Sequence, residues 1–305
     1  MLGRSERESG AHARSAVTAA GWDDHEPVDA AGPGARPAEL ELLDLGTTSA
    51  TLATVARIEG LRAVLHVGHP QQPAHELERA MLAADPSLVL TASVAVLSQW
   101  AWVAPAAAAT GGVVVDEAGM RDCRHVLRTM GASPHLVPTR TSLAERVEIA
   151  GPGGSLVIER SRVPAGWVEL AGSERLRDAD PIWYGLVESR AEATITDGGA
   201  QVWLAFGPSD DHRGSLQRVL GVLADVGIDL DHLRSHPSSA GPHVFFASFG
   251  CSSTQLLRDL LARLTEQSVA QRVLAVLPGR EFVPSPHAFT PRWDAARPVA
   301  ATTGA

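Results

Sequence analysis

Lysine is absent from this chain of 305 residues, and arginine supplies all 26 of its basic side chains. Aspartate and glutamate together number 35, which leaves a formal net charge of −9 and an isoelectric point near 5.7. An acidic protein without a basic run does not attract the phosphates of nucleic acid or of an anionic membrane. We therefore expect no nucleic acid and no membrane among its partners.

Cysteine is also scarce, since only Cys123 and Cys251 occur. A disulfide scaffold and a C-x-x-C metal site are thereby excluded, and buried thiols are expected. His66, His69 and His75 fall in a segment rich in proline and glutamine, but zinc prefers a tighter set that includes acidic or thiol ligands. The sequence thus predicts no metal and no cofactor.

An uninterrupted apolar segment is missing as well, although residues 86–115 carry no charge. Gln99, Pro105 and the turn Thr110-Gly111-Gly112 break this stretch, whereas a spanning helix needs about 20 apolar residues in succession. Buried strands of an α/β core are the better interpretation. The segment Met1–Arg14 is charged and polar, without the apolar core of a signal peptide, which predicts a cytoplasmic protein.

The length and a hydrophobic content of 45% suit a globular protein of two domains. Residues 1–37 lack periodicity and end in a Pro-Gly-Ala-Arg-Pro run, so we predict a disordered tail there. Residues 38–189 alternate apolar strands with amphipathic helices, the pattern of an α/β domain with a mostly parallel sheet. Residues 190–200 are expected to be a linker, 201–283 a second domain, and 284–305 a loose C-terminal tail.

The second domain has the clearest pattern. Its expected elements follow the order βαββαβ, which is the plan of ferredoxin-like domains. The helices have leucines spaced three and four residues apart, and Gly227 follows the first helix as a C-terminal stop. The expected elements are strand Gln201–Phe206, helix Ser215–Val226, strands Ile228–Ser235 and His243–Phe249, helix Thr254–Gln267 and strand Arg272–Leu277.

Four short motifs in this domain carry a family resemblance. Arg213-Gly214-Ser215-Leu216, Gly227-Ile228-Asp229-Leu230, Arg234-Ser235-His236-Pro237 and Val244-Phe245-Phe246 occur in register. They resemble P-G-A-L, G-I-N/D-L, E-S-R-P and F-F of the ACT regulatory domain of prephenate dehydratases. The resemblance implies a homodimer paired through ACT domains and a site for a phenylalanine-like amino acid. The effector-binding residues it implies are Gly214, Ser215, Leu216, Arg234, Ser235, His236 and Pro237.

The upstream domain is similar to the catalytic domain of the same family. Leu45-Gly46-Thr47-Thr48-Ser49 resembles L-G-P-x-G-T-F-S/T, and Asp122–Leu127 resembles the Q-C-R-x-x-L helix. Thr139–Glu145 resembles S-T-x-E-A, and Gly166–Leu170 with Asp178 resembles Y-G-L-x-x-L and the following Asp. The resemblance implies a two-lobed, periplasmic-binding-protein-like fold with its active site between the lobes.

The departures from the family pattern concern the chemistry itself. Ile182 and Trp183 stand where the family has its catalytic Thr-Arg pair, and Thr91-Ala92-Ser93 replaces its P-x-E-N-S substrate loop. Isoleucine has no proton to donate, and tryptophan cannot clamp a carboxylate as a guanidinium does. Trp183 is expected to project into the cleft and fill it. The remaining catalytic candidates are Thr47, Thr48, Ser49 and Ser93.

Three functional hypotheses remain. The first is a prephenate dehydratase-like protein of phenylalanine metabolism whose ACT domain binds an aromatic amino acid and whose dehydratase chemistry is impaired or repurposed. The second is an active lyase on prephenate or a related cyclohexadiene acid, bound between the lobes. The third is a regulatory ACT-domain module without enzyme activity. A prephenate assay and calorimetry with phenylalanine distinguish the three.

Overall fold

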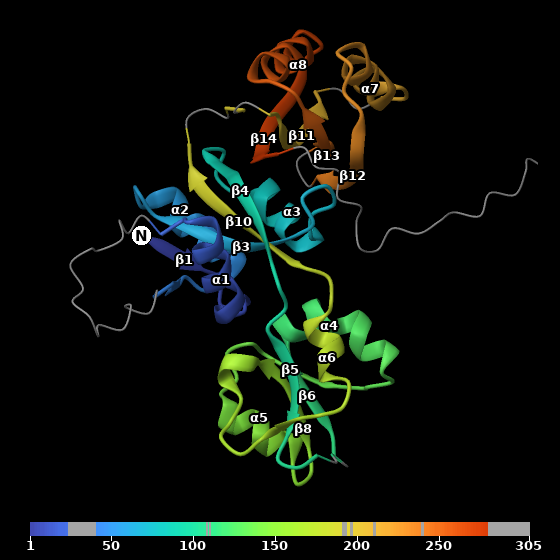
Figure 1. Cartoon of the computed structure of the whole chain (residues 1–305). Coiled ribbons are helices and arrows are strands. Elements are labelled where there is room, and N and C mark those ends of the chain that lie inside the picture. Colours follow the sequence, from blue (N-terminus) through green and yellow to red (C-terminus); the bar gives the residue numbers. More distant parts are fainter. Residues whose placement is uncertain are drawn as a thin grey trace, which may run out of the picture.

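The computed structural model describes residues 1–23, 41–107, 109, 111–190, 194–195, 198–209, 212–238 and 241–279. The described residues form one nine-stranded sheet and one five-stranded sheet with helices packed on them (Figure 1). The larger sheet belongs to a first lobe and to the C-terminal domain, and the smaller sheet to a second lobe. The predicted class, a two-lobed α/β domain followed by a βαββαβ domain, is confirmed.

The first lobe contributes five strands in the spatial order β4-β10-β3-β1-β2. Strands β1, β2 and β3 are parallel, and β10 runs antiparallel between β3 and β4. Its elements are β1 (Leu2–Arg4), α1 (Gly10–Ala20), β2 (Leu43–Asp44), α2 (Thr48–Arg57), β3 (Arg62–Gly68), α3 (His75–Ala83), β4 (Leu88–Val96) and β10 (Ile182–Ser189).

The prediction of a disordered N-terminal tail is wrong for residues 1–23. Strand β1 pairs with both β2 and β3, so it lies inside the sheet. Helix α1 packs beside it, and the side chains of Ala13, Ala16 and Val17 are fully buried. Alanine-rich helices bury small side chains and so show only weak hydrophobic periodicity in the sequence. The composition of residues 1–23 therefore resembles that of a disordered segment. Residues 24–37, the rest of the predicted tail, lie outside the described residues.

The second lobe has the strand order β7-β6-β8-β5-β9. The uncharged stretch forms β4, β5 and β6, buried strands as expected, and no helix among the described residues is long and apolar enough to cross a membrane. Its elements are β5 (Trp100–Ala104), β6 (Val113–Asp116), α4 (Glu117–Thr129), β7 (His135–Val137), α5 (Leu143–Ala150), β8 (Ser155–Glu159), a 3₁₀ turn (Arg160–Arg162), β9 (Val168–Glu169) and α6 (Ser173–Arg177).

The C-terminal domain has the expected order β11-α7-β12-β13-α8-β14. Its strands pair antiparallel in the spatial order β12-β13-β11-β14, and both helices cover one face of them (Figure 1). The elements are β11 (Ala200–Pro208), α7 (Ser215–Asp225), β12 (Leu230–Ser238), β13 (Gly241–Cys251), α8 (Thr254–Glu266) and β14 (Val269–Pro278).

Strand pairing, a hydrogen bond and a shared hydrophobic core join the C-terminal domain to the first lobe. Strand β14 pairs with β4 at Ala275 and Leu90, which makes one continuous sheet. Trp203 is fully buried at this junction and donates from its indole nitrogen to the carbonyl of Pro70 at 2.7 Å. The shared hydrophobic core fixes the orientation of this domain on the first lobe.

Candidate active site between the lobes

A cavity of about 690 Å³ opens where the lobes meet. His66 lines it from β3, Arg121 and Asp122 from α4, and the connection from α6 to β10 closes one side. A neighbouring cavity of about 670 Å³ shares Arg121 and Asp122 and is lined by further charged residues. The two cavities form one cleft, and their size suits a small organic ligand.

Helix α4 carries the central residues of the cleft. Its N-cap is Asp116, whose carboxylate accepts from the backbone of Gly119 at 2.7 Å and pairs with the buried Arg146 at 2.7 Å. A Cβ at Gly119 would lie 2.8 Å from a methyl group of Val115, so only glycine lets the helix start this close to β6. Burial raises the pKa of the Asp116 carboxyl, against the opposing effect of Arg146.

Arg121 stands between two carboxylates. Its Nη1 lies 3.1 Å from Oε2 of Glu8, which precedes α1, and its Nε donates to Oδ1 of Asp122 at 2.9 Å. Asp122 also accepts from the indole nitrogen of Trp100 at 3.1 Å. The exposed fraction of the acidic side chains is 5% for Glu8 and 1% for Asp122, so the charges interact at low dielectric.

The titration of these groups follows from burial and mutual charge. Burial raises the pKa of the Glu8 carboxyl, and the neighbouring Arg121 only partly opposes this. Burial acts in the same direction on Asp122, but there the charge and hydrogen bond of Arg121, together with the nearby His66 and His12, outweigh it and the pKa falls below the ordinary value. Burial disfavours the charge of Arg121, yet Asp122 and Glu8 hold the pKa of the guanidinium well above its usual range.

His66 is a neutral imidazole at the wall of the cleft. Burial, reinforced by the positive charge of Arg121, lowers the pKa of His66 to about 3. Its Nε2 lies 3.7 Å from Oδ1 of Asp122, and its ring faces that of Tyr184 edge-on at 6.0 Å. A histidine with so low a pKa can accept a hydrogen bond from a ligand, but it is a weak base near neutral pH.

Tyr184 lies behind the cleft, fully buried in β10. Its hydroxyl has no hydrogen-bond partner among the described residues, and Nη2 of Arg121 likewise has none there. Burial, with the negative charge of Glu8, raises the pKa of the tyrosine well above its usual range. The phenol thus stays protonated, next to a guanidinium with one free donor.

A second polar cluster ties the lobes together beside the cleft. The hydroxyl of Ser9 contacts Nδ1 of His12 and donates to Glu159, which lies at the end of β8. The backbone N–H of Gln99 donates to Nε2 of His12 at 2.7 Å, so the proton of this neutral ring sits on Nδ1 and is donated to Ser9. Burial lowers the pKa of His12, in agreement with a neutral ring. The Ser9 hydroxyl therefore donates to the Glu159 carboxylate and has no accepting imidazole of the kind that activates a serine nucleophile.

The two residues at the predicted Thr-Arg positions lie on opposite faces of β10. Ile182 lines the cavity, but Trp183 packs with the hydrophobic core beneath α2 and α3, and its ring meets that of His69 at 5.9 Å. The prediction that Trp183 fills the cleft is therefore wrong, because adjacent strand residues point to opposite faces. Neither residue supplies a charge or a proton donor to the cleft.

The other catalytic candidates lie away from the Arg121 cluster. Ser93 is half-buried inside β4, opposite Gly185, so the predicted substrate loop lies within a strand, next to a shift of register at Thr91. Thr47 caps α2 by accepting from the backbone of Ala50 at 3.2 Å. Together with Thr48 and Ser49 it lines a hollow of about 660 Å³ that shares Arg7 and Glu76 with the outer cavity and does not include Arg121. The strand–turn–helix unit that reaches the cleft is β1–α1, which also begins with Leu-Gly.

The predicted effector residues divide between two places. Gly214 precedes α7 with a φ of 96°, Ser215 is buried there beside His212, and Leu216 packs in the core of the domain. On the edge strand β12, Ser235 and Pro237 are exposed, whereas Arg234 and His236 contact α3 of the first lobe. The structure does not gather these seven residues into one cavity among those described.

Glu8, His12, His66, Arg121 and Tyr184 were not among the sequence candidates. Glu8 and His12 lie in the segment for which disorder was predicted. Ser9 as an N-cap and Gly21 as a helix stop are the sequence signals that indicate helix α1 there. Arg121 directly precedes the Asp122–Leu127 motif, and only the fold brings it to Glu8, 113 residues away.

The described fold defines a class of protein with two α/β lobes, a charged cleft between them and a C-terminal βαββαβ domain. No family model matches the chain, and no curated protein matches it. Among solved structures, prephenate dehydratase from Arthrobacter aurescens in complex with L-Phe is similar over 92% of this chain and 90% of its own, with a TM-score of 0.65 and 18% identity.

Two further solved structures share the fold. Prephenate dehydratase from Staphylococcus aureus covers 77% of this chain and 89% of its own, with a TM-score of 0.54 and 11% identity. GqqA, described as a novel type of quorum quenching acylase, covers 92% of this chain and 98% of its own, with a TM-score of 0.58 and 19% identity. The chain thus has a prephenate dehydratase-like fold.

Proposed function

We propose that the chain is a prephenate dehydratase-like protein of aromatic amino-acid metabolism in which the dehydratase chemistry is impaired or repurposed. The observation that carries the proposal is the pairing of Arg121 with both Glu8 and Asp122 in the cleft. A guanidinium already held between two buried carboxylates is a poor clamp for the carboxylate of a substrate.

The charge balance of the inner cleft argues against a dianionic substrate. Prephenate brings two carboxylates. The cavity walls carry the guanidiniums of Arg121 and Arg175 but also Asp122, Asp178 and Asp180, and Glu8 pairs with Arg121, so acidic groups outnumber basic ones. Two like charges about 5 Å apart at an effective dielectric near 20 repel by about 3 kcal/mol. Ile182 at the cavity wall adds neither a hydrogen bond nor a charge. A ligand with a neutral body fits this cavity better.

The outer cavity offers a place for a single carboxylate. Arg7, Arg124 and Arg128 line it, with Glu76 and Glu117 on the same walls. These side chains keep solvent contact, so an incoming anion displaces water rather than a buried ion pair. We infer a ligand with one acidic group at this outer end and an uncharged part facing His66.

The C-terminal domain is proposed to be an ACT domain that binds an aromatic amino acid. The motifs around Gly214 and along β12 support this, as does a similar structure that is described as a complex with L-Phe. The exposed residues Ser235 and Pro237 on the edge strand leave a surface on which a second copy can pair. A homodimer through these edges is part of the proposal.

The test combines two measurements on the full-length chain. Conversion of prephenate to phenylpyruvate is followed by absorbance, and binding of L-phenylalanine by calorimetry. The proposal predicts no turnover above the uncatalysed rate, together with measurable heat of binding. Turnover comparable to that of a prephenate dehydratase assayed in parallel would support the active-lyase alternative. The absence of binding heat with both L-phenylalanine and prephenate would refute the sensor role.

A second candidate function is acyl hydrolysis, because the similarity to GqqA gives a substrate class to try first. His66 lines the cleft beside Asp122 and can hydrogen-bond a bound ligand, although its pKa of about 3 makes it a weak base. Substrates of the quorum-quenching acylase type are assayed with the wild type and with His66→Gln. The absence of hydrolysis by the wild type excludes this function, and hydrolysis that persists unchanged in the variant excludes a role for His66.

A further inference from the structure

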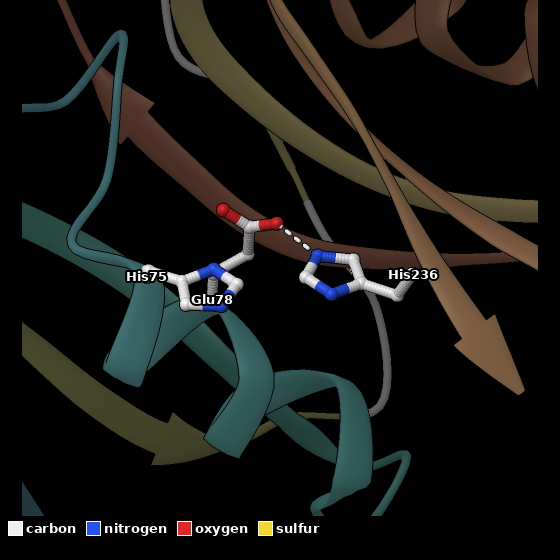
Figure 2. Close-up of side chains that lie close together, drawn as sticks. All are labelled: His75, Glu78 and His236. Atoms are coloured by element: carbon white, nitrogen blue, oxygen red, sulfur yellow. Dashed lines mark hydrogen bonds and ion pairs between the residues drawn. The ribbon is translucent and has the colours of Figure 1, made fainter.

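Two histidines and a glutamate meet where the C-terminal domain rests on the first lobe. His75 and Glu78 lie one turn apart on α3, and His236 approaches from β12 (Figure 2). One potential ligand atom of each lies within 4.8 Å of the others. The sequence-based prediction of no metal compared His75 only with the nearby histidines. His236, which completes this cluster, comes 158 residues after Glu78 in the chain.

The three side chains lie close enough together to share one cation after rotation of the stacked rings. The carboxylate of Glu78 is fully buried and bonds to Nε2 of His236. The two imidazole rings stack with their centroids 5.4 Å apart and their planes 12° apart. Figure 2 shows the carboxylate and both rings converging from the two elements. The donor set is two imidazoles and a carboxylate, which binds zinc and leaves one position open.

Arg234 currently supplies the positive charge of this cluster. Its Nη1 donates to Oε2 of Glu78 at 2.6 Å and to Nδ1 of His75 at 2.9 Å. Because a guanidinium only donates, His75 must present the lone pair of Nδ1 to it. The same lone pair is the one a metal ion would take. The arginine side chain is 27% exposed, so it can withdraw toward solvent.

We propose that His75, Glu78 and His236 form a site for a divalent transition-metal ion of the zinc type, which replaces the guanidinium of Arg234. The ion would connect α3 to β12 and hold the C-terminal domain on the first lobe. Residues 72–74, directly before α3, line the cavity between the lobes, so the site adjoins the cleft. The proposal is independent of the reaction assigned to the cleft.

The test is a Zn²⁺ titration of the full-length chain, first stripped with a chelator, in competition with a chromophoric chelator. We expect one ion per chain. His75→Gln and His236→Gln are each expected to weaken binding roughly 100-fold or more, because even indirect ligand supports cost 10–100-fold. His135→Gln is the matched control, since His135 is exposed on β7 in the other lobe.

Arg234→Gln gives the sharpest result. Removal of the competing positive charge is expected to tighten Zn²⁺ binding roughly tenfold or more. Co²⁺ is expected to give visible absorption bands in the wild type that are lost in His236→Gln, and circular dichroism verifies that the variant is folded. Equal Zn²⁺ affinity in the wild type, His75→Gln and His236→Gln would overturn the proposal, and so would weaker binding in Arg234→Gln.

Discussion

At the residue scale, the cleft is defined by charge pairing rather than by any single catalytic side chain. Arg121 is held by Glu8 and Asp122, and Tyr184 keeps a buried hydroxyl beside it. The family resemblance places the Thr-Arg positions at Ile182 and Trp183. Only Ile182 faces the cavity, because the strand alternates its side chains.

Replacement of Trp183 by arginine is expected to destabilise the protein without any gain of activity. Trp183 packs on the core beneath α2 and α3, so Trp183→Arg loses apolar packing and brings a charge there, at a cost of about 2 kcal/mol or more. Ile182→Thr is expected to cost about 1.5 kcal/mol or less, since it faces the cavity. Ile182 lines the cavity but is also buried in the core of the lobes, so its replacement has a cost of its own. Urea denaturation measures both variants, and a wild-type midpoint for Trp183→Arg would contradict the packing assigned to Trp183.

The lowered pKa of His66 predicts an acid-sensitive fold. Its pKa is about 3 in the folded state, against an ordinary value near 6.5, so the unfolded chain binds more protons between these limits. Stability therefore falls as the pH decreases from 6.5, by about 2 kcal/mol at pH 5 for this group alone. His12 acts in the same direction, whereas the raised pKa of Glu8 acts in the opposite one.

The difference between wild type and His66→Gln isolates this contribution. Urea midpoints are measured from pH 7 to pH 5 for both proteins. The lowered pKa of Asp122 places its own loss of stability at lower pH, outside this window. We expect a flatter pH dependence in the variant, and parallel curves would show that His66 is not buried in its neutral form.

At the element scale, helix α1 is the least expected part of the fold and one of the most consequential. It brings Ser9 and His12 to Glu159 of the second lobe, while Glu8 before it reaches Arg121. Its alanines pack without the leucine spacing that identified α7 and α8. Periodicity therefore predicted the C-terminal domain well and missed α1, although the capping signals of α1 are ordinary.

Ser9→Ala is expected to lower the free energy of unfolding by about 2 kcal/mol. The change removes the N-cap of α1 and leaves Glu159 without a buried hydroxyl partner. Thr47→Ala is the matched control, because Thr47 caps α2 with one hydrogen bond at an exposed position and should cost about 1 kcal/mol. A smaller effect for Ser9→Ala than for the control would argue against the lobe-to-lobe cluster.

At the scale of the whole molecule, local patterns predicted the fold class but not the site. Strand and helix spacing reports contacts within an element, and the α/β class and the βαββαβ domain follow from it, whereas the two-lobed plan follows from the family resemblance. The cleft joins residues 8, 66, 121 and 184, and the zinc-type cluster joins 78 to 236. No local period records such pairings, which arise only when the sheet is assembled.

We propose that the cleft does not support prephenate dehydration, because two buried carboxylates neutralise its guanidinium. Phenylpyruvate formation by the full-length chain at saturating prephenate tests this directly. We expect a rate equal to that of prephenate without protein. A protein-dependent rate that disappears in Arg121→Gln, with the fold verified by circular dichroism, would contradict it.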